Sequence, residues 1–238
     1  MAFGAEVNVL NLNAVLPVGK EFHVRDYPHI LISGEVVASD VKKVRDLLPR
    51  LKQAKNPTYI PLVFLNSPGG DLIAAMQIGG ILRSTTAWLV VDSGANCFSA
   101  CIFVLAAGMD RWVLDGSRLG IHRPYFDPKF FGGLDVAAAT SRYEELSRRA
   151  REYLRTMEMS DELFSDMLQV PSNRIRIIDS AYAERMRLVG SDPGLEEWRR
   201  SRLRNTHGEK FVQQLDRYLE CLNTGIGRSE CDTRFPTK

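Results

Sequence analysis

Apolar residues along this chain occur in two arrangements: short continuous runs, and longer stretches in which they recur with helical spacing. The short runs are typical of buried strands, which we expect at residues 28–37, 59–65, 88–91, 111–114, 118–121 and 174–178. Helical spacing predicts helices at 41–55, 72–83, 99–107, 134–157, 160–168 and 179–187. Pro49 interrupts the first of these helices and predicts a kink or an early end there.

The predicted elements repeat as strand, glycine-bearing turn, helix and strand. This order predicts an α/β domain with a largely parallel core and with its loops gathered at one end. Beyond Gly190 the composition becomes charged and polar, and helices are expected at 196–203 and 209–222. We therefore divide the chain into an N-terminal segment (1–27), a main domain (28–190) and a helical C-terminal extension (191–238).

Composition narrows the class of protein. Hydrophobic residues make up 45% of the chain and charged residues 25%, which is typical of a soluble globular protein with a large core. The net charge of +2 predicts neither a nucleic-acid partner nor an anionic membrane surface. No apolar run approaches the roughly 18 to 20 residues of a membrane span. The first residues show no basic leader followed by an apolar block, so we expect no signal peptide in this sequence; a chain begun after a removed signal would look the same.

The four cysteines carry some information about the compartment. Nine residues, two of them glycines, separate Cys221 from Cys231. In an exported protein this pair would close a small disulfide loop, whereas in the cytosol it would be two thiols; we favour the bridge. Cys97 and Cys101 are expected to be small core residues rather than reactive thiols. Neither they nor the scattered histidines form a metal-binding pattern, so no metal or other cofactor is expected.

Three turns stand out for their chemistry, and each follows or ends an apolar strand. They are Pro68-Gly69-Gly70, Cys97-Phe98-Ser99-Ala100 and Ile121-His122-Arg123-Pro124. Taken singly, they are a tight turn, a helix N-cap and a structural histidine. Taken together at one edge of a core, they offer a serine nucleophile, a histidine general base, and backbone N–H donors for an oxyanion.

The order N-S-P-G-G-D, then S-A at a helix start, then A-A-G, then S-R-L-G-I-H-R-P resembles the Clp-type proteolytic subunit, ClpP. It is most similar to the ClpP-like, often exported, bacterial serine proteases, over about residues 28–190. The resemblance implies the ClpP/crotonase-like fold of repeated ββα units. It also implies that Ser99 is the nucleophile, that His122 is the general base, and that Gly70 and Ala100 form the oxyanion hole with Gly69 shaping the turn.

The same resemblance implies a serine endopeptidase that acts on peptides or unfolded proteins and assembles as a homo-oligomer. The long helix at 134–157 would join rings of subunits. We expect a periplasmic or exported protein, with the cytoplasm as the alternative. The sequence contains no ATPase motif, so coupling to an unfoldase would need a separate partner.

The sequence departs from the ClpP pattern at the acidic residue that orients the histidine. Counting back from Leu188-Val189 places Ile175 at that position. Asn173 and Asp179 flank it and are the candidates for the role, and Asp166 is more distant. Without such an acceptor a serine–histidine pair still reacts, but more slowly.

Two other functions are compatible with the same motifs. One is a catalytically weak or inactive ClpP-like protein that binds peptides or serves as a scaffold, which the missing acid favours. The other is a crotonase-type acyl-CoA hydratase or thioesterase. That enzyme would bind coenzyme A and need acidic residues near the oxyanion hole, where only Asp71 is close in the sequence.

Overall fold

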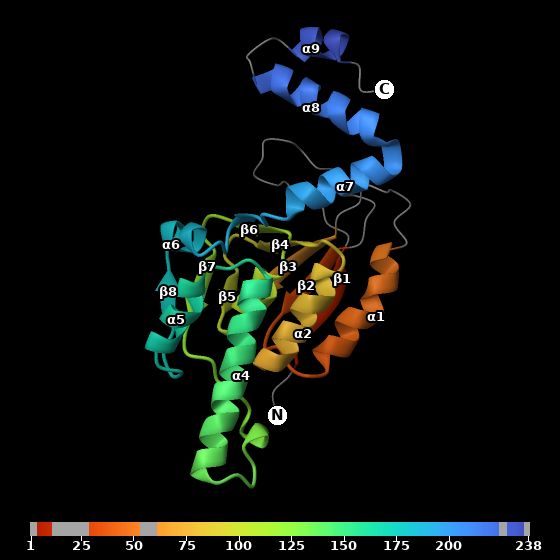
Figure 1. Cartoon of the computed structure of the whole chain (residues 1–238). Coiled ribbons are helices and arrows are strands. Elements are labelled where there is room, and N and C mark those ends of the chain that lie inside the picture. Colours follow the sequence, from red (N-terminus) through yellow and green to blue (C-terminus); the bar gives the residue numbers. More distant parts are fainter. Residues whose placement is uncertain (1–3, 11–28, 53–60, 224–227, 236–238) are drawn as a thin grey trace. The chain divides into compact units, whose positions relative to one another are not determined.

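The structure is a computed structural model that describes residues 4–10, 29–52, 61–223 and 228–235 (Figure 1). The chain forms two compact units, Met1–Asp192 and Pro193–Lys238. Most of the N-terminal segment expected at 1–27 lies outside the described residues. The part that is described includes a strand, β1 (Glu6–Leu10), which the apolar pattern did not predict.

A six-stranded sheet forms the centre of the first unit, in the order β1-β2-β3-β4-β6-β9. Its inner strands run parallel to one another, and β1 and β9 pair antiparallel at the two edges. The prediction of a largely parallel α/β core is therefore confirmed. The remaining strands of this sheet are β2 (His29–Ser33), β3 (Leu62–Asn66), β4 (Trp88–Val91), β6 (Asp110–Val113) and β9 (Gly190–Ser191).

Both faces of this sheet are covered, which explains why its strands are continuous apolar runs. Successive side chains of a strand point to opposite faces. Val63 and Leu65 accordingly join the main core under the helices, whereas Leu62 and Phe64 belong to a second cluster on the other face.

Three helices pack around the strands that carry the predicted turns. They are α1 (Asp40–Lys52), α2 (Leu72–Arg83) and α3 (Ala100–Ala106). Helix α2 contacts both of the others, and Figure 1 shows α1 and α2 on the same side of the sheet. Helix α1 continues through Pro49 to Lys52, so the early end predicted at that proline is wrong.

A second, three-stranded sheet contains β5 (Asn96–Phe98), β7 (Arg118–Ile121) and β8 (Arg176–Ile178). Strand β5 was not predicted, because the Gly94-Ala95-Asn96 stretch has the composition of a turn. An isolated bridge between Ser67 and Cys97 joins this sheet to the end of β3. Two predicted turns, the one after β3 and the one after β5, are thereby held side by side.

The rest of the first unit is helical, in α4 (Val136–Thr156), α5 (Asp161–Gln169), α6 (Ser180–Arg185) and the 3₁₀ turn η1 (Pro128–Phe130). Helix α4 is the longest, and its N-terminal half extends away from the sheets (Figure 1). Leu146, Ala150 and Leu154 in its C-terminal half are buried in the core. The N-terminal half has no buried residue.

The second unit is helical in its described residues. It contains α7 (Leu195–His207), α8 (Glu209–Asn223) and α9 (Arg228–Arg234), the last of which was not predicted. A disulfide joins Cys221 to Cys231, and the Arg200 guanidinium donates two hydrogen bonds to the Asp216 carboxylate. In the described part of the chain, every helix is too short or too polar to span a bilayer.

Candidate active site

Ser99 lies at the turn between β5 and α3, in a backbone conformation that residues with a Cβ rarely adopt. Its φ is 56° and its ψ is −123°. Its N–H donates to Gly120 O at 2.9 Å, and its carbonyl accepts from Ile102 N at 3.0 Å. Its side chain makes no capping hydrogen bond, so the predicted N-cap position is correct but the hydroxyl is not used as a cap. A strained serine at a sharp strand-to-helix turn is the geometry of a nucleophile elbow.

Gly69 lies directly against this serine, and Gly70 lies against the backbone of Val36. A Cβ at Gly69, where φ is +105°, would be 2.7 Å from Ser99 Cβ and 3.0 Å from Ala100 N. A Cβ at Gly70, where φ is +133°, would be 2.2 Å from Val36 O. Only glycine fits either position, both for lack of space and for backbone conformation.

The backbone bonds around these glycines leave two N–H groups uncommitted. Gly69 O accepts from Val36 N at 2.7 Å, and Asp71 N donates to Val36 O at 2.8 Å. The N–H groups of Gly70 and Ala100 have no acceptor among the residues that the structure describes. Unpaired backbone donors at a turn are the groups an oxyanion hole requires.

His122 follows directly on β7, and its ring is held by the backbone of the next residue. Its Nδ1 lies 2.8 Å from Arg123 O. Because a carbonyl only accepts, Nδ1 carries the proton in this pair and Nε2 is left with its lone pair. No hydrogen bond links the Ser99 hydroxyl to His122 in the described structure. Catalytic hydrogen bonds often form only when substrate is bound.

Arg123 is itself tightly fixed. Its Nε and Nη2 donate to Leu168 O at 3.0 and 2.8 Å, and its N–H donates to Val170 O at 2.8 Å. These bonds tie the residue that follows His122 to the C-terminal end of α5. The Arg123 carbonyl is a backbone group, which no side-chain pattern in the sequence signals.

Ile175, the residue that counting back from Leu188-Val189 places at the position of the acid, directly precedes β8. Strand β8 pairs with β7 so that Arg176 is opposite Ile121, and Ile175 and His122 are the next residues beyond this last pair. A Cβ on Gly120 would be 2.5 Å from Ile175 Cγ2, so this side chain packs onto β7 beside the histidine. An aliphatic side chain cannot accept the Nδ1 proton.

The other acid candidates are committed elsewhere or make no contact with His122. Asp179 caps α6 by accepting from Tyr182 N at 2.7 Å. Asp166 accepts from the Tyr182 hydroxyl at 2.7 Å and pairs with Arg176; the tyrosine hydrogen bond is the main cause that lowers the pKa of Asp166. Asn173 is exposed and makes no side-chain hydrogen bond among the described residues.

Ser99, His122 and Gly70 all line one cavity of about 650 Å³. The structure thus brings the three predicted turns together. A second cavity of about 690 Å³ adjoins it, since Tyr125, Pro128 and Ser172 line both. The second cavity is largely apolar; Phe126, Phe131, Tyr143 and Leu168 also line it.

Charged groups line the first cavity at the start of α2. Asp71 caps that helix by accepting from Ala74 N at 3.0 Å, and its other carboxylate oxygen lies 3.7 Å from Lys129 Nζ. Lys129 also pairs with Asp127 at 2.9 Å, and its N–H and ammonium lower the pKa of that carboxyl. No group of three or more potential metal ligands occurs within the described ranges.

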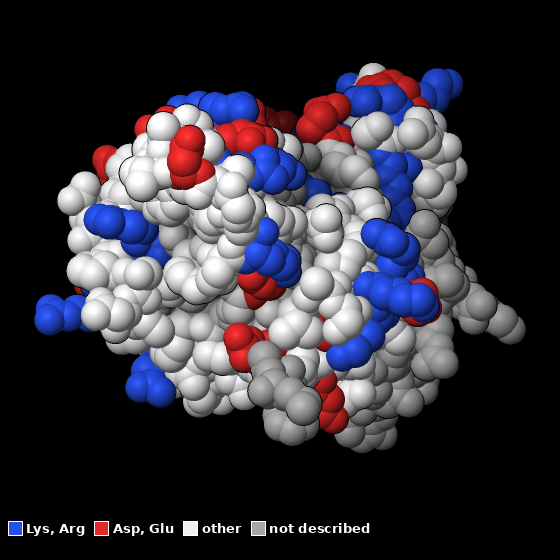
Figure 2. Space-filling model, turned by 90° about the horizontal axis from the view of Figure 1, so that it is seen from below, with Lys and Arg blue, Asp and Glu red and all other residues white. Residues whose placement is uncertain are grey.

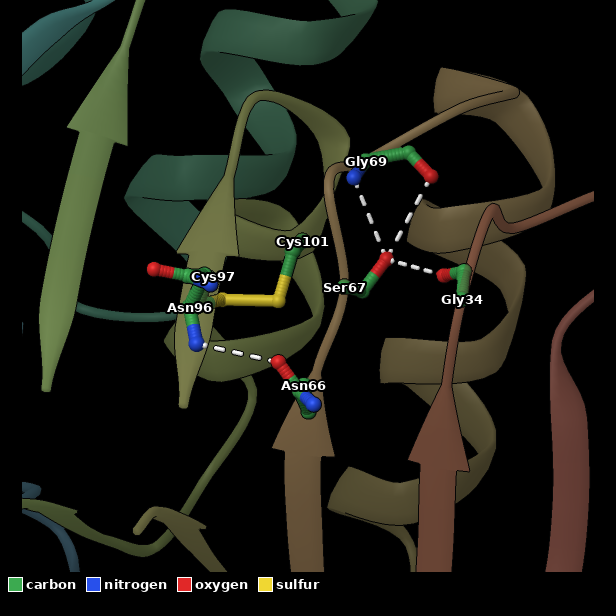
Figure 3. Close-up of a disulfide and its surroundings, with 7 residues drawn as sticks. All are labelled: Gly34, Asn66, Ser67, Gly69, Asn96, Cys97 and Cys101. Carbon is green, nitrogen blue, oxygen red and sulfur yellow. Dashed lines mark hydrogen bonds between the residues drawn. A yellow bond between two sulfur atoms is a disulfide. The ribbon is translucent and has the colours of Figure 1, made fainter. Parts of the chain in front are cut away.

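A disulfide that was not predicted brackets Ser99. Cys97 and Cys101 are both buried, as expected of core residues, and they are bonded to each other, which was not predicted from the sequence (Figure 3). The bond crosses from a strand to a helix, because β5 ends between the two cysteines.

The fold and these turns define a ClpP/crotonase-like α/β protein with the layout of a serine-peptidase site. The Clp protease family model matches residues 23–176, more than half of the chain, and the chain belongs to this family of serine proteases. Among solved structures, a mutant of ClpP1 from Listeria monocytogenes is similar, with 21% sequence identity and a TM-score of 0.51. The match covers 67% of this chain and 86% of that one, and it supports the fold.

Proposed function

We propose that this protein is a serine peptidase that cleaves peptide bonds through a Ser99 acyl-enzyme. One observation carries the proposal. Ser99 has a strained backbone and an uncapped hydroxyl, and it lies in the same cavity as His122, beside two N–H groups that have no acceptor in the described structure. Strain of this kind persists only where the surroundings enforce it, and it clusters at reactive sites.

In the proposed reaction, the Ser99 oxygen attacks the carbonyl carbon of the scissile bond while its proton passes to His122 Nε2. The N–H groups of Gly70 and Ala100 donate to the oxygen that becomes negative. Collapse of the tetrahedral intermediate breaks the C–N bond, and the leaving amine takes the proton from His122. Water then attacks the ester in the same way and releases the second product with Ser99 restored.

Arg123 O takes the orienting role for which Asn173 and Asp179 were the sequence candidates. It accepts a hydrogen bond from His122 Nδ1–H and so keeps the tautomer in which Nε2 is the base. A neutral carbonyl stabilises the imidazolium less than a carboxylate does, because hydrogen bonds between two charged groups are stronger. We therefore expect a working enzyme that is slower than one with an acid at position 175.

The apolar cavity that adjoins the site fits an aliphatic or aromatic side chain of the substrate next to the scissile bond. Its lining includes Tyr125, Phe126, Phe131 and Leu168. Burying such a side chain is favourable by about 25 cal/mol per Å² of apolar surface. Fluorogenic peptides with Leu or Phe before the scissile bond should therefore be cleaved faster than otherwise identical peptides with Asp.

A fluorophosphonate probe tests the proposal directly. It should label Ser99 in the wild-type protein, Ser99→Ala should remove the label, and His122→Ala should slow labelling and peptide cleavage by roughly 10²- to 10⁴-fold. Ser172→Ala is the matched control, because Ser172 lines the same cavity without a strained turn, and it should label at the wild-type rate. A wild-type protein that binds peptides but neither labels nor cleaves would instead be an inactive, peptide-binding relative.

We propose that the substrates are peptides or unfolded proteins and that the protein self-associates. Leu134 and Val136, beside the protruding half of α4, are 43% and 85% exposed, which favours burial of this helix against another copy. Sedimentation of the wild type and of Val136→Glu measures this self-association, which the variant should weaken.

Acidic and basic residues are scattered over the face shown in Figure 2, with uncharged surface between them. This distribution differs from the continuous basic patch that is typical of a nucleic-acid-binding protein.

We also propose an exported, periplasmic location. Two disulfides, Cys97–Cys101 and Cys221–Cys231, favour an oxidising compartment, because cytosolic thiols are kept reduced. Trapping thiols with an alkylating reagent at the moment of cell lysis, followed by mass spectrometry, tests this. Full alkylation of all four cysteines would place the protein in a reducing compartment.

A further inference from the structure

The Cys97–Cys101 disulfide closes a covalent ring around the turn that carries Ser99. Cys97 is the middle residue of β5, and Cys101 is the second residue of α3, so Ser99 is midway between them. Both cysteines are at most 1% exposed. The bond is therefore sealed inside the first unit, directly beneath the proposed nucleophile.

The strand side of this turn is well anchored by hydrogen bonds. Ser67 N donates to Asn96 O at 2.7 Å, and Phe98 N donates to Ser67 O at 3.0 Å. Asn96 N donates to the Asn66 side chain at 3.1 Å (Figure 3). The Ser67 hydroxyl in turn donates to Gly34 O at 2.6 Å and accepts from Gly69 N at 3.1 Å, which fixes the glycine turn alongside.

The helix side of the turn lacks the usual anchor. Helix α2, which follows the neighbouring turn, begins with a side-chain cap from Asp71. Helix α3 begins at Ser99, whose hydroxyl makes no cap. A serine that serves as a nucleophile cannot also use its oxygen to hold the first turn of the helix. The disulfide supplies a link between β5 and that first turn which does not use the hydroxyl.

We propose that Cys97 and Cys101 are positioning residues whose bond holds Ser99 and the Ala100 N–H in the reactive arrangement. This rests on the proposed function, in which Ser99 is the nucleophile. It adds that the reaction rate depends on whether Cys97 and Cys101, four positions apart in the sequence, are oxidised to the disulfide. Reduction by a dithiol would break the Sγ–Sγ bond, transfer two electrons and two protons to form two thiols, and leave the dithiol as its own disulfide. The turn would then relax and the rate would fall.

The competing explanation is that the bond only stabilises the fold. Cys221–Cys231 provides the comparison, since it also closes a short loop but belongs to the other unit. A bond that only stabilises would affect unfolding and leave the turnover of the folded enzyme alone. Loss of a bond that positions Ser99 would lower kcat with little change in KM, because it would misplace the reacting groups and leave most of the cavity that binds the substrate unchanged.

The experiment compares Cys97→Ala, Cys101→Ala and the double variant, with Cys221→Ala/Cys231→Ala as the matched control. Misplacement by about 1 Å costs up to roughly 100-fold in rate, so we expect kcat and fluorophosphonate labelling to fall roughly 10- to 100-fold. The two single variants and the double variant should fall equally, because losing either sulfur breaks the same bond. The control should keep the wild-type kcat.

Hydrogen–deuterium exchange provides a readout that needs no activity. Amides of the peptide covering residues 97–104 should exchange faster in the three variants than in the wild type, and those of β2 and β3 should not.

If a variant fails to fold, the Cys221→Ala/Cys231→Ala control, which keeps only the Cys97–Cys101 bond, can be reduced with dithiothreitol. The two thiols that form are counted by mass spectrometry, and the protein is then reoxidised. Activity should fall and return with the bond.

The outcomes separate this inference from the proposed function. A wild-type protein whose Ser99 does not react with the probe contradicts the peptidase proposal, while the exchange measurement still decides whether the bond holds the turn. Wild-type labelling together with unchanged kcat and exchange in the variants overturns the positioning role alone. Additive losses from the two single variants would also overturn it, because they would reflect the packing of each side chain rather than the bond.

Discussion

The turn that carries Ser99 and the strand end that carries His122 are built very differently. Ser99 is surrounded by fixed backbone: a disulfide spans it, its N–H is bonded to Gly120, and Gly69 is packed against it. Within the described residues the His122 ring makes one hydrogen bond, to the neighbouring Arg123 carbonyl, and the aliphatic Ile175 lies just beyond the last pair of β7 with β8. The nucleophile is held on several sides, and the base on one.

This difference indicates which groups would contribute most to the rate enhancement of such a site. Donors and a nucleophile that are already in place supply electrostatic stabilisation without reorganisation, which is usually the largest single contribution to catalysis. A base held by a neutral acceptor contributes less. We therefore expect changes to the residues that hold the Ser99 turn to cost much more activity than changes to the groups that orient the His122 ring, and the variants below test that ranking.

Among variants that keep both Ser99 and His122, the largest effect is expected from Gly69→Ala. The new methyl group would meet Ser99 Cβ at 2.7 Å and Phe98 O at 2.8 Å, and alanine is also strained at a φ of +105°. We expect kcat/KM to fall at least about 100-fold, since the turn must shift to make room. Stopped-time assays with a fluorogenic peptide measure it.

Gly80→Ala is the matched control for that substitution. Gly80 is exposed in the middle of α2, and a Cβ there would meet nothing within 4 Å. Activity should stay at the wild-type value, and stability should rise by about 1 kcal/mol through helix propensity. Equal activity losses in the two variants would show that the position of Gly69 beside Ser99 is unimportant.

The contrast between the two regions also shows which structural features could be predicted from the sequence. Residues 72–83 and 88–91 were predicted with the boundaries that the structure has, because a capped amphipathic helix and an apolar run are local patterns. The meeting of Gly70, Ser99 and His122 could be inferred because each ends or follows a strand of one core. Features that a local sequence pattern specifies could therefore be predicted.

Features that depend on a contact with residues distant in the sequence could not be predicted. Strand β5 is three residues long and exists through its pairing with β7, so no periodicity marks it. Without β5 the Cys97–Cys101 bond could not be foreseen. The contact between His122 and Arg123 O uses a backbone atom that every residue possesses, whereas a sequence motif can identify only side chains.

A gain of activity is expected from Ile175→Asp, which would add a second group to hold the His122 ring. The new carboxylate would lie just beyond the last pair of β7 with β8, as His122 does, and accept a hydrogen bond from the His122 Nδ1–H with a charged group. The stronger hydrogen bond to the imidazolium is worth about 1 kcal/mol, or roughly fivefold in kcat. The acidic limb of the pH–rate profile should also move to higher pH, since the charged histidine is favoured.

Ile177→Asp is the control, because Ile177 is 51% exposed and pairs with Gly120 rather than with His122. It adds the same charge to the same strand and should leave both the rate and the pH profile unchanged. A similar gain in both variants would mean that general electrostatics, and not an oriented acceptor, limits the reaction.

A smaller effect is expected from Arg123→Ala. The variant keeps the carbonyl but loses the two hydrogen bonds to Leu168 O that fix it. We expect kcat to fall roughly threefold, because the lost contacts hold the acceptor and do not touch the substrate. In an Ile175→Asp background the same change should have no effect, since the carboxylate then orients the histidine. A loss of equal size in both backgrounds would assign Arg123 a purely structural role.

The smallest effect on activity is expected at the two residues that flank Ile175. Asn173→Ala removes a side chain without a hydrogen bond in the described structure, and Asp179→Ala removes the cap of α6. Both should keep kcat within about twofold of the wild type, whereas the loss of the cap should lower the free energy of unfolding by about 1 kcal/mol. Urea unfolding and peptide turnover, measured on the same preparations, separate the two effects. A large drop in kcat for either variant, with the pH profile shifted as well, would restore that residue as the partner of His122 and remove the contrast between the two regions.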